Sequence, residues 1–351
     1  MSHKKISMFK EEINLISDTI TRPTDEMLAF MMKAKVGDDV FGADPTVIEL
    51  QNKIASLFGM EAALFFPSGT MANQTAIKLH TQPAEQLICD KWSHVFNYES
   101  GGASFHSGVS CKLIDGERGM FKAEQLVDVI HDPNKNYLPI SSLVVVENTT
   151  NKGGGSCWDY AELEKIKQVC SENRLAYHLD GARLFNALVA GNESPSDYGK
   201  LFDTISICLS KGLGAPIGSL LLSSKENIYK AQRIRKLFGG GMRQVGYLAA
   251  AGIYALDHHV ERLRDDHDRA DALGKALLGC QWVAKVEPIE TNIIIFQLHK
   301  NRDENVFLQK LEKENIKLIS MGEGKLRMVT HLEFTDQMLR KVIDAVGKIG
   351  G

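Results

Sequence analysis

The 351-residue chain is long enough for one large domain and a smaller lobe, and 44% hydrophobic with 24% charged residues is an ordinary globular composition. The formal net charge is −3 with both signs interspersed, which argues against a nucleic-acid or membrane partner. The first residues lack the apolar core of a signal peptide, and the longest apolar stretch, 247–256, is too short to span a membrane. We therefore expect a cytoplasmic protein.

The six cysteines are scattered along the chain, and no two of them form a Cys-x-x-Cys pair. Disulfide frameworks and zinc sites need tighter spacing than this. Several of the cysteines lie in apolar runs, where a thiol behaves as a small hydrophobic group. The sequence therefore predicts neither a disulfide framework nor a zinc site, and we assign no catalytic metal.

Short apolar runs alternate with longer amphipathic runs from about residue 61 onward. The expected strands are 62–66, 87–90, 143–147, 176–180, 204–208 and 217–222. The expected helices are 70–80, 123–131, 160–173 and 225–236, followed by a long helical run over 247–280. This alternation predicts an α/β fold with a mostly parallel sheet that helices cover on both faces.

The tail of the chain has a different pattern, with expected strands at 291–298 and 325–329 and a helix around 305–315. A smaller C-terminal α+β lobe would account for this change. We therefore expect three parts: an N-terminal arm over 1–45, a large domain over 46–254 and a small domain over 255–351.

Polar residues collect where the expected strands end, which is where ligands bind in parallel sheets. The first strand runs into Ser68, Gly69 and Thr70 at the start of a helix, and such a turn offers main-chain N–H groups to a phosphate. An ordinary helix cap by Ser68 or Thr70 is the alternative. A P-loop is excluded because its Gly-Lys-Ser/Thr ending is missing.

Two further strand ends carry charged side chains. One ends in Asp180 and Arg183, which could also be a structural ion pair. The next ends at Lys211, the only charged residue between Thr204 and Ser224. Burial of a lysine disfavours its ammonium form and yields a nucleophilic amine, although a lysine can also extend to the surface.

These pieces together match the requirements of pyridoxal 5'-phosphate. A lysine such as Lys211 forms the Schiff base, and a carboxylate such as Asp180 keeps the pyridine nitrogen protonated. The turn at Gly69 would bind the phosphate. Each signal is weak alone, but their combination at successive strand ends predicts a pyridoxal-phosphate enzyme.

Motifs spread over nearly the whole chain indicate a resemblance to a known family. They are LISDTITRP (15–23), VGDDVFG (36–42), PSGT (67–70), VENT (146–149), HLDGAR (178–183), ICLSKGLG (207–214), GGGMRQ (239–244) and LRMVTHL (326–332). With these motifs the chain resembles the threonine aldolases of the β-eliminating lyase group, of the low-specificity L-threonine aldolase type. The resemblance implies the aspartate-aminotransferase-like fold and a homotetramer built as a dimer of dimers.

The resemblance also implies roles for individual residues at the cofactor. Lys211 would form the Schiff base, Asp180 would pair with the pyridine nitrogen, and His94 would stack on the ring. Arg183 would contact the phenolic oxygen and the substrate. The remaining cofactor-binding residues would be Ser68, Gly69, Thr70 and Ser210, with Lys236 and Arg243 reaching the phosphate from a neighbouring subunit.

The substrate carboxylate would be bound by Ser17 and Arg327, because a guanidinium binds a planar carboxylate through two hydrogen bonds. Many members of the family carry a histidine where this chain has Thr150, near the substrate β-hydroxyl. A threonine is not a useful base near neutral pH. Phe41 stands where many members have tyrosine, and Tyr98 is a further candidate for substrate discrimination.

The resemblance thus implies a lyase that cleaves L-threonine or L-allo-threonine into glycine and acetaldehyde. Thr150 motivates an alternative on the same scaffold, a β-eliminating lyase or an aldolase for bulkier substrates such as phenylserine. A non-catalytic binding protein is a third hypothesis. Such a protein could lose Lys211 or Asp180 without penalty, and the presence of both residues argues against it. The expected partners are therefore an amino-acid substrate and other copies of the chain.

Overall fold

The computed structural model describes residues 12–350, and among them it divides the chain into two compact units. The larger unit is Thr21–Arg264, and the smaller unit joins residues 12–20 to residues 265–350. The expected domain bounds at residues 45 and 254 differ from these junctions. The first described strand explains part of the difference, because β1 (Ile13–Asn14) pairs with β11 (Ile316–Lys317) of the tail.

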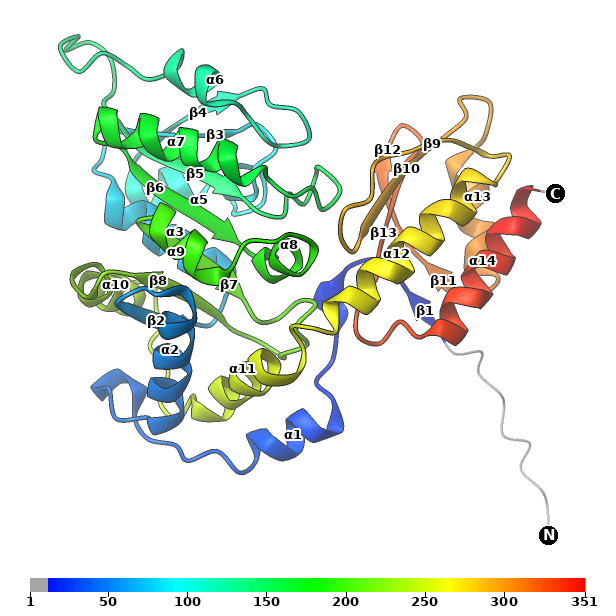
Figure 1. Cartoon of the computed structure of the whole chain (residues 1–351), viewed down its shortest axis with the longest axis horizontal. Helices are drawn as coiled ribbons and strands as arrows, with labels where there is room; N and C mark the ends of the chain where they lie inside the picture. The colour runs from blue at the N-terminus through cyan, green and yellow to red at the C-terminus, as the bar shows by residue number, and fades with distance from the viewer. Residues whose placement is uncertain (1–11, 351) are drawn as a thin grey trace. The chain divides into compact units, whose positions relative to one another are not determined.

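The larger unit is built on a seven-stranded sheet in the order β2-β8-β7-β6-β5-β3-β4 (Figure 1). Its strands are β2 (Ala62–Phe66), β3 (Gln86–Asp90), β4 (Ser110–Ile114), β5 (Ser141–Glu147), β6 (Ala176–Gly181), β7 (Thr204–Cys208) and β8 (Ser219–Ser223). Only β8 runs antiparallel to its two neighbours, β2 and β7. The predicted mostly parallel sheet is thus confirmed.

Helices cover both faces of this sheet. They are α1 (Asp25–Met31), α2 (Pro45–Phe58), α3 (Gly69–His80), α4 (His94–Asn97), α5 (Gly102–Ser107), α6 (Ala123–Val127), α7 (Tyr160–Asn173), α8 (Leu184–Ala190), α9 (Pro195–Leu201), α10 (Lys225–Leu237) and α11 (Gly246–His258). Alternate strand residues enter different cores: Val144 packs in the cluster that contains α2 and α7, and Val145 packs in the cluster that contains α3. Strands buried on both faces explain the continuous apolar runs.

Local signals in the sequence account for several helix ends. Asp44 caps α2 by accepting the main-chain N–H groups of Thr46 and Val47, and Pro45 occupies its first turn. Gly59 ends α2 in the left-handed conformation, with φ of 63°. Ser68 caps α3 by accepting the N–H of Met71.

Two expected helices differ from the structure, and one strand of the larger sheet was not predicted. The expected helix over 247–280 is two helices, α11 and α12 (Leu263–Leu278), because α11 packs in the core of the larger unit whereas Leu273 of α12 packs in the core of the smaller. The helix expected over 123–131 ends at Val127, and the ring of His131 bonds the carbonyl of Pro139. Strand β4 was not predicted, because as a partly exposed edge strand it lacks a long apolar run.

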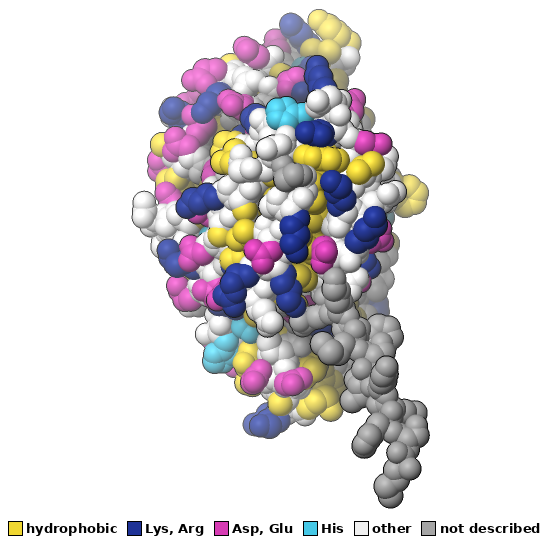
Figure 2. Space-filling model, turned by 90° about the vertical axis from the view of Figure 1, so that its right-hand side faces the viewer, with side chains coloured by type: hydrophobic (Ala, Val, Ile, Leu, Met, Phe, Trp, Pro, Cys, Tyr) yellow, Lys and Arg dark blue, Asp and Glu magenta, His cyan; other side chains and the backbone are white. Residues whose placement is uncertain are grey.

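The smaller unit has a four-stranded antiparallel sheet in the order β12-β13-β10-β9. Its strands are β9 (Val283–Val286), β10 (Ile293–Leu298), β12 (Ile319–Gly322) and β13 (Lys325–Val329), and its helices include α13 (Glu304–Glu312) and α14 (Asp336–Gly350). Phe296, Phe307 and Val342 share its core, which confirms an α+β arrangement. On the face shown in Figure 2, acidic and basic side chains are intermixed.

None of the helices in the described part of the chain combines the length and the apolar character that crossing a membrane requires.

Candidate active site

The carboxyl ends of β5, β6 and β7 bring three polar side chains side by side: Glu147, Asp180 and Ser206. Glu147 at the end of β5 pairs in register with Asp180 on β6, and Asp180 pairs with Ser206 on β7. Lys211 follows β7 within three residues of Cys208. Because neighbouring parallel strands end at one edge, residues far apart in sequence meet there.

Lys211 lies half-buried at this edge, and its Nζ is 3.2 Å from the Sγ of Cys208. Arg183, which is buried, lines the same small cavity as Lys211 and Cys208. Arg183 also donates from Nη1 to the Oδ1 of Asn151 at 3.4 Å. The predicted lysine and arginine are therefore brought together around one cavity, next to the half-buried Ser210.

Asp180 is 2% exposed and accepts hydrogen bonds at both carboxylate oxygens. Its Oδ1 accepts the main-chain N–H of Ala182 at 3.1 Å, and its Oδ2 accepts from the Nδ2 of Asn73 at 2.9 Å. These two hydrogen bonds hold the carboxylate in one orientation. The contacts thus suit Asp180 to the role of a fixed negative charge.

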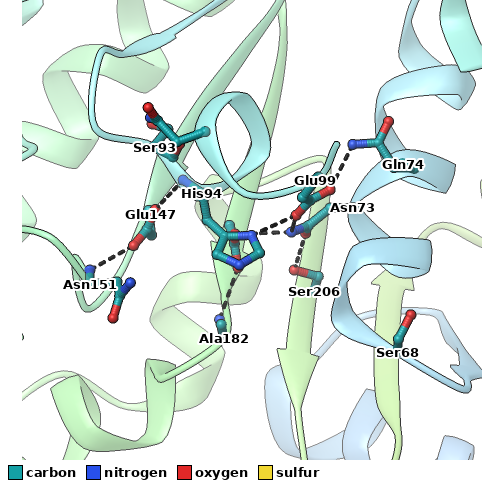
Figure 3. A network of polar contacts seen from close by, with 12 residues as sticks. Ser68, Asn73, Gln74, Ser93, His94, Glu99, Glu147, Asn151, Ala182 and Ser206 are labelled. Atoms are coloured by element: carbon teal, nitrogen blue, oxygen red, sulfur yellow. Dashed lines mark hydrogen bonds and ion pairs between the residues drawn. The ribbon is translucent and has the colours of Figure 1, made fainter. Parts of the chain in front are cut away.

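His94 begins α4, directly after the loop that follows β3. Its Nδ1 lies 2.9 Å from the Oε1 of Glu99, and one ring nitrogen of His94 and carboxylate oxygens of Glu99 and Asp180 fall within 4.8 Å of one another. Burial lowers the pKa of His94, but the Glu99 hydrogen bond and the charges of Asp180, Glu99 and Glu147 together raise it above its ordinary value. The ring of His94 is therefore held beside Asp180, and Figure 3 shows it pointing toward Glu99.

The trio of His94, Glu99 and Asp180 could hold a metal ion by its composition. Hydrogen-bond donors already occupy these ligands, however, since Asn73 donates to both carboxylates and His94 contacts Glu99. We therefore retain the prediction that no catalytic metal is bound here.

The start of α3 is the helix end that the sequence predicts to bind a phosphate. Ser68 and Thr70 are exposed, and Gly69 begins the helix. A β-carbon added to Gly69 would lie 2.6 Å from the Sγ of Cys208, closer than packed atoms approach. Only glycine lets this helix end approach the strand that leads to Lys211.

A Gly69→Ala variant is expected to lose about 1–3 kcal/mol of unfolding free energy through overpacking, and to bind pyridoxal phosphate more weakly. Cys208→Ala in the same chain should restore most of both losses, because it removes the atom that the new methyl group meets. Urea denaturation and cofactor titration of the apoprotein measure these effects. Gly347→Ala is the control, since no atom lies within 4 Å of its β-carbon position; equal stability of Gly69→Ala and wild type would contradict the argument.

Glu147 is a buried carboxylate that the sequence argument did not single out. Its Oε2 accepts the main-chain N–H of His94 at 2.7 Å, and its Oε1 accepts that of Asn151 at 2.6 Å. It thereby joins α4 to the turn that follows β5 (Figure 3). Burial, together with the charge of Asp180, raises the pKa of Glu147 to about 7.

This raised pKa predicts a pH dependence of stability. In the unfolded chain Glu147 ionises near its ordinary pKa of about 4.3, so folding favours the protonated form and its contribution is lost as pH rises toward 7. Glu147→Gln removes this dependence, and its unfolding free energy relative to wild type should rise by up to about 3 kcal/mol between pH 5 and 8. Urea denaturation of the apoprotein measures it, with exposed Glu261→Gln as control. Parallel pH profiles for wild type and Glu147→Gln would refute it.

The other expected residues lie farther from this cluster or in the smaller unit. Tyr98 is half exposed, with its ring centroid 5.6 Å from that of His94. Lys236 is exposed at the end of α10, and the guanidinium of Arg243 pairs with Asp38 at 2.8 Å and lies over the ring of Phe41. The contacts of Arg243 are thus with residues of its own chain.

Thr150 is buried, and its Oγ1 makes no hydrogen bond to any described residue. Its side chain packs against the backbone of Gly119, and its hydroxyl lies next to Gly153. A β-carbon on Gly153 would lie 2.2 Å from that hydroxyl. Thr150 thus fills the base of the glycine-rich turn that follows β5.

Within the smaller unit, Ser17 and Arg327 lie close in space. Arg327 donates from Nη2 to the carbonyl of Ile16 at 3.2 Å, and Val329 donates its N–H to the carbonyl of Leu15. The hydroxyl of Ser17 accepts the N–H of Thr19. The pair expected to bind a carboxylate is therefore brought together by the pairing of this segment with β13.

Several polar residues of the site were missed from the sequence: Asn73, Gln74, Glu99, Glu147, His178 and Ser206. Glu147 carried a signal, because it is a carboxylate at a strand end like Asp180. Asn73 and Gln74 lie in a short polar stretch of α3, and only the packing of this helix on the sheet buries them. No local pattern distinguishes them from surface residues.

Comparison with known proteins places this site in context. Residues 14–301 match the beta-eliminating lyase family. The low-specificity L-threonine aldolase of Escherichia coli K12 is 39% identical over 330 residues, covering 94% of this chain and 97% of its own. The solved threonine aldolase of Leishmania major has a TM-score of 0.85 at 20% identity, covering 97% and 100% of the two chains. A variant serine palmitoyltransferase from S. paucimobilis with bound PLP reaches 0.75 at 17% identity, covering 97% and 88%.

Proposed function

We propose that this chain, which belongs to the beta-eliminating lyase family, is a lyase that cleaves L-threonine or L-allo-threonine to glycine and acetaldehyde. The observation that carries the proposal is the edge of the sheet where the Lys211 amine, the Asp180 carboxylate and the start of α3 meet. Two relatives that match nearly the whole chain, from Arabidopsis thaliana and Escherichia coli K12, are named low-specificity L-threonine aldolases.

The residues at this edge fit pyridoxal phosphate. They supply an amine at Lys211, a carboxylate at Asp180 and a helix start at Gly69 whose missing β-carbon leaves room for a close approach. Arg183 would contact the phenolic oxygen, and His94 would cover the ring. When bound, pyridoxal phosphate accepts the electron pair that bond cleavage leaves on the substrate α-carbon.

The side chains of the protein would then act on the cofactor and on the substrate. Asp180 would hold a proton on the pyridine nitrogen, because its own oxygens are fixed by Ala182 and Asn73. His94 would be kept in place at its ring by Glu99 and at its main chain by Glu147. Arg327 and Ser17 would bind the substrate carboxylate, as two neighbouring groups of the smaller unit.

A product assay tests the proposed reaction. The purified protein is incubated with pyridoxal phosphate and L-threonine, L-allo-threonine, serine or phenylserine, and acetaldehyde, benzaldehyde and 2-oxo acids are measured. Acetaldehyde from threonine or allo-threonine supports the proposal. A preference for phenylserine would favour the bulky-substrate aldolase, 2-oxobutyrate or pyruvate would favour elimination, and no turnover of any substrate would reject all three activities.

We also propose that the chain acts in the cytoplasm as a homo-oligomer, most simply a tetramer. Several large apolar side chains of the larger unit are exposed, and association with other copies would remove such surface from water. They are Met32, Phe41, Phe105 and Leu237, each more than 70% exposed. Light scattering on the holoenzyme measures the assembly.

A further inference from the structure

Asn73 lies on α3, one turn after Gly69, and is 2% exposed. Its Nδ2 donates to the Oε1 of Glu99 at 2.8 Å and to the Oδ2 of Asp180 at 2.9 Å. Its Oδ1 accepts from the Oγ of Ser206 at 2.6 Å and lies 3.2 Å from the Nε2 of His178. Every donor and acceptor of this amide is therefore occupied, and Figure 3 shows Asn73 beside Glu99 and Ser206.

The two carboxylates decide which way this amide points. A carboxylate accepts hydrogen bonds and cannot donate them, so the NH₂ group must face Glu99 and Asp180. The amide oxygen then faces His178, and His178 must donate from its Nε2. If the amide were turned around, its oxygen would meet two negative charges in a buried site.

This orientation sets the proton position on His178. Burial lowers the pKa of His178 to about 4, so the ring is neutral at pH 7 and Nε2 carries its one proton. Its Nδ1 lies 2.9 Å from the Oγ1 of Thr204 and must accept from that hydroxyl. The same hydroxyl lies 3.1 Å from the Nε2 of His80, whose pKa burial also lowers to about 4.

We propose that Asn73 is a positioning residue that holds Asp180 and Glu99 in one hydrogen-bonded frame with His94. The two carboxylates set the direction of its amide, and a one-way hydrogen-bond chain from His80 through Thr204 and His178 supports that direction by donating to the amide oxygen. The inference rests on the proposed function, since Asp180 and His94 are the side chains assigned to the cofactor. Gln74 supports the same frame by donating to the Oε2 of Glu99 at 2.6 Å. Thr204 thus acts on the site through two other residues.

The first test locates the proton on His178 in the wild-type holoenzyme. Solid-state ¹⁵N NMR of histidine-labelled protein separates protonated from unprotonated ring nitrogens, and the His178 signals are assigned by their loss in His178→Gln. The expected result is a neutral ring with the proton on Nε2. A proton on Nδ1, or on both nitrogens, would overturn the proposal.

The second test uses Thr204→Val, which removes the hydroxyl and keeps the shape of the side chain. The Nδ1 of His178 would then face only the carbonyl oxygen of residue 204, which lies 3.2 Å away and can accept a hydrogen bond but cannot donate one. The proton is expected to move to Nδ1, so the Asn73 oxygen loses the hydrogen bond from His178 and its amide holds Asp180 less firmly. Cofactor affinity should then fall about tenfold, the size of one hydrogen bond to a charged group.

Thr75→Val is the matched control. Thr75 lies on the same helix as Asn73, it is fully buried, and its hydroxyl bonds none of the described residues. This variant should bind pyridoxal phosphate as wild type does. An affinity of Thr204→Val within twofold of the control would overturn the proposal.

The two proposals can fail separately. Cofactor affinity and the His178 proton position are measured without substrate, so they report on the hydrogen-bond chain even if the holoenzyme cleaves no threonine. Conversely, normal threonine cleavage with an Nδ1-protonated His178 would retain the proposed function and reject the role of Asn73.

Discussion

Lys211→Ala is expected to lower threonine cleavage by about three orders of magnitude or more, the scale of removing a covalently acting residue. Lys211 carries the amine that the proposed function assigns to the covalent bond with the cofactor aldehyde, and its Nζ lies against Cys208 at the edge shared with Asp180. Acetaldehyde release measures the rate. The absorbance of the purified protein reports whether the cofactor remains covalently attached.

Two further variants make this result specific. Lys211→Arg keeps a positive charge but has no amine that condenses with an aldehyde, so it should be as inactive as Lys211→Ala. Lys225→Ala changes an exposed lysine at the start of α10 and should leave the rate unchanged. Activity of Lys211→Ala within tenfold of wild type would show that another group bonds the cofactor.

Asp180→Asn is expected to lower the turnover number by two to three orders of magnitude, about the effect of removing one preorganised electrostatic partner. The new side chain has the same shape but no charge, so the pyridine nitrogen would no longer be held protonated. Its NH₂ group would also face a donor, either the amide of Asn73 or the N–H of Ala182. Steady-state kinetics measure the loss.

The charge and the shape of this residue can be separated. Asp180→Glu retains the carboxylate on a longer side chain and should recover part of the turnover that Asp180→Asn loses. Asp197→Asn changes a partly exposed carboxylate in the same unit and serves as the control. If Asp180→Asn and Asp180→Glu were equally impaired, position rather than charge would be the important property.

Regular patterns made much of the sheet predictable. The apolar runs over β2, β5, β6 and β7 are long enough to indicate strands, and their bounds in the structure agree to within two residues. Edge strand β4 lacks such a run and was missed. The helical periodicity over 247–280 continues across a boundary at which the buried face passes from one core to another, so periodicity alone could not locate the break.

The sequence by itself determined the chemistry available at the site. Lys211 and Gly69 follow strands, and Asp180 lies near the end of one. A lysine in an apolar stretch, a carboxylate at a strand end and a glycine before a helix each indicate a function without knowledge of the fold. The motifs that surround them indicated the family.

Only the tertiary structure decided how those groups are held. Asn73, Glu99 and His178 come from a helix, a loop and a strand that lie far apart in the chain, and nothing local marks them as buried. Their roles follow from the packing of α3 on the sheet, because burial compels each polar atom to find a partner. The direction of the Asn73 amide is a property of that closed network.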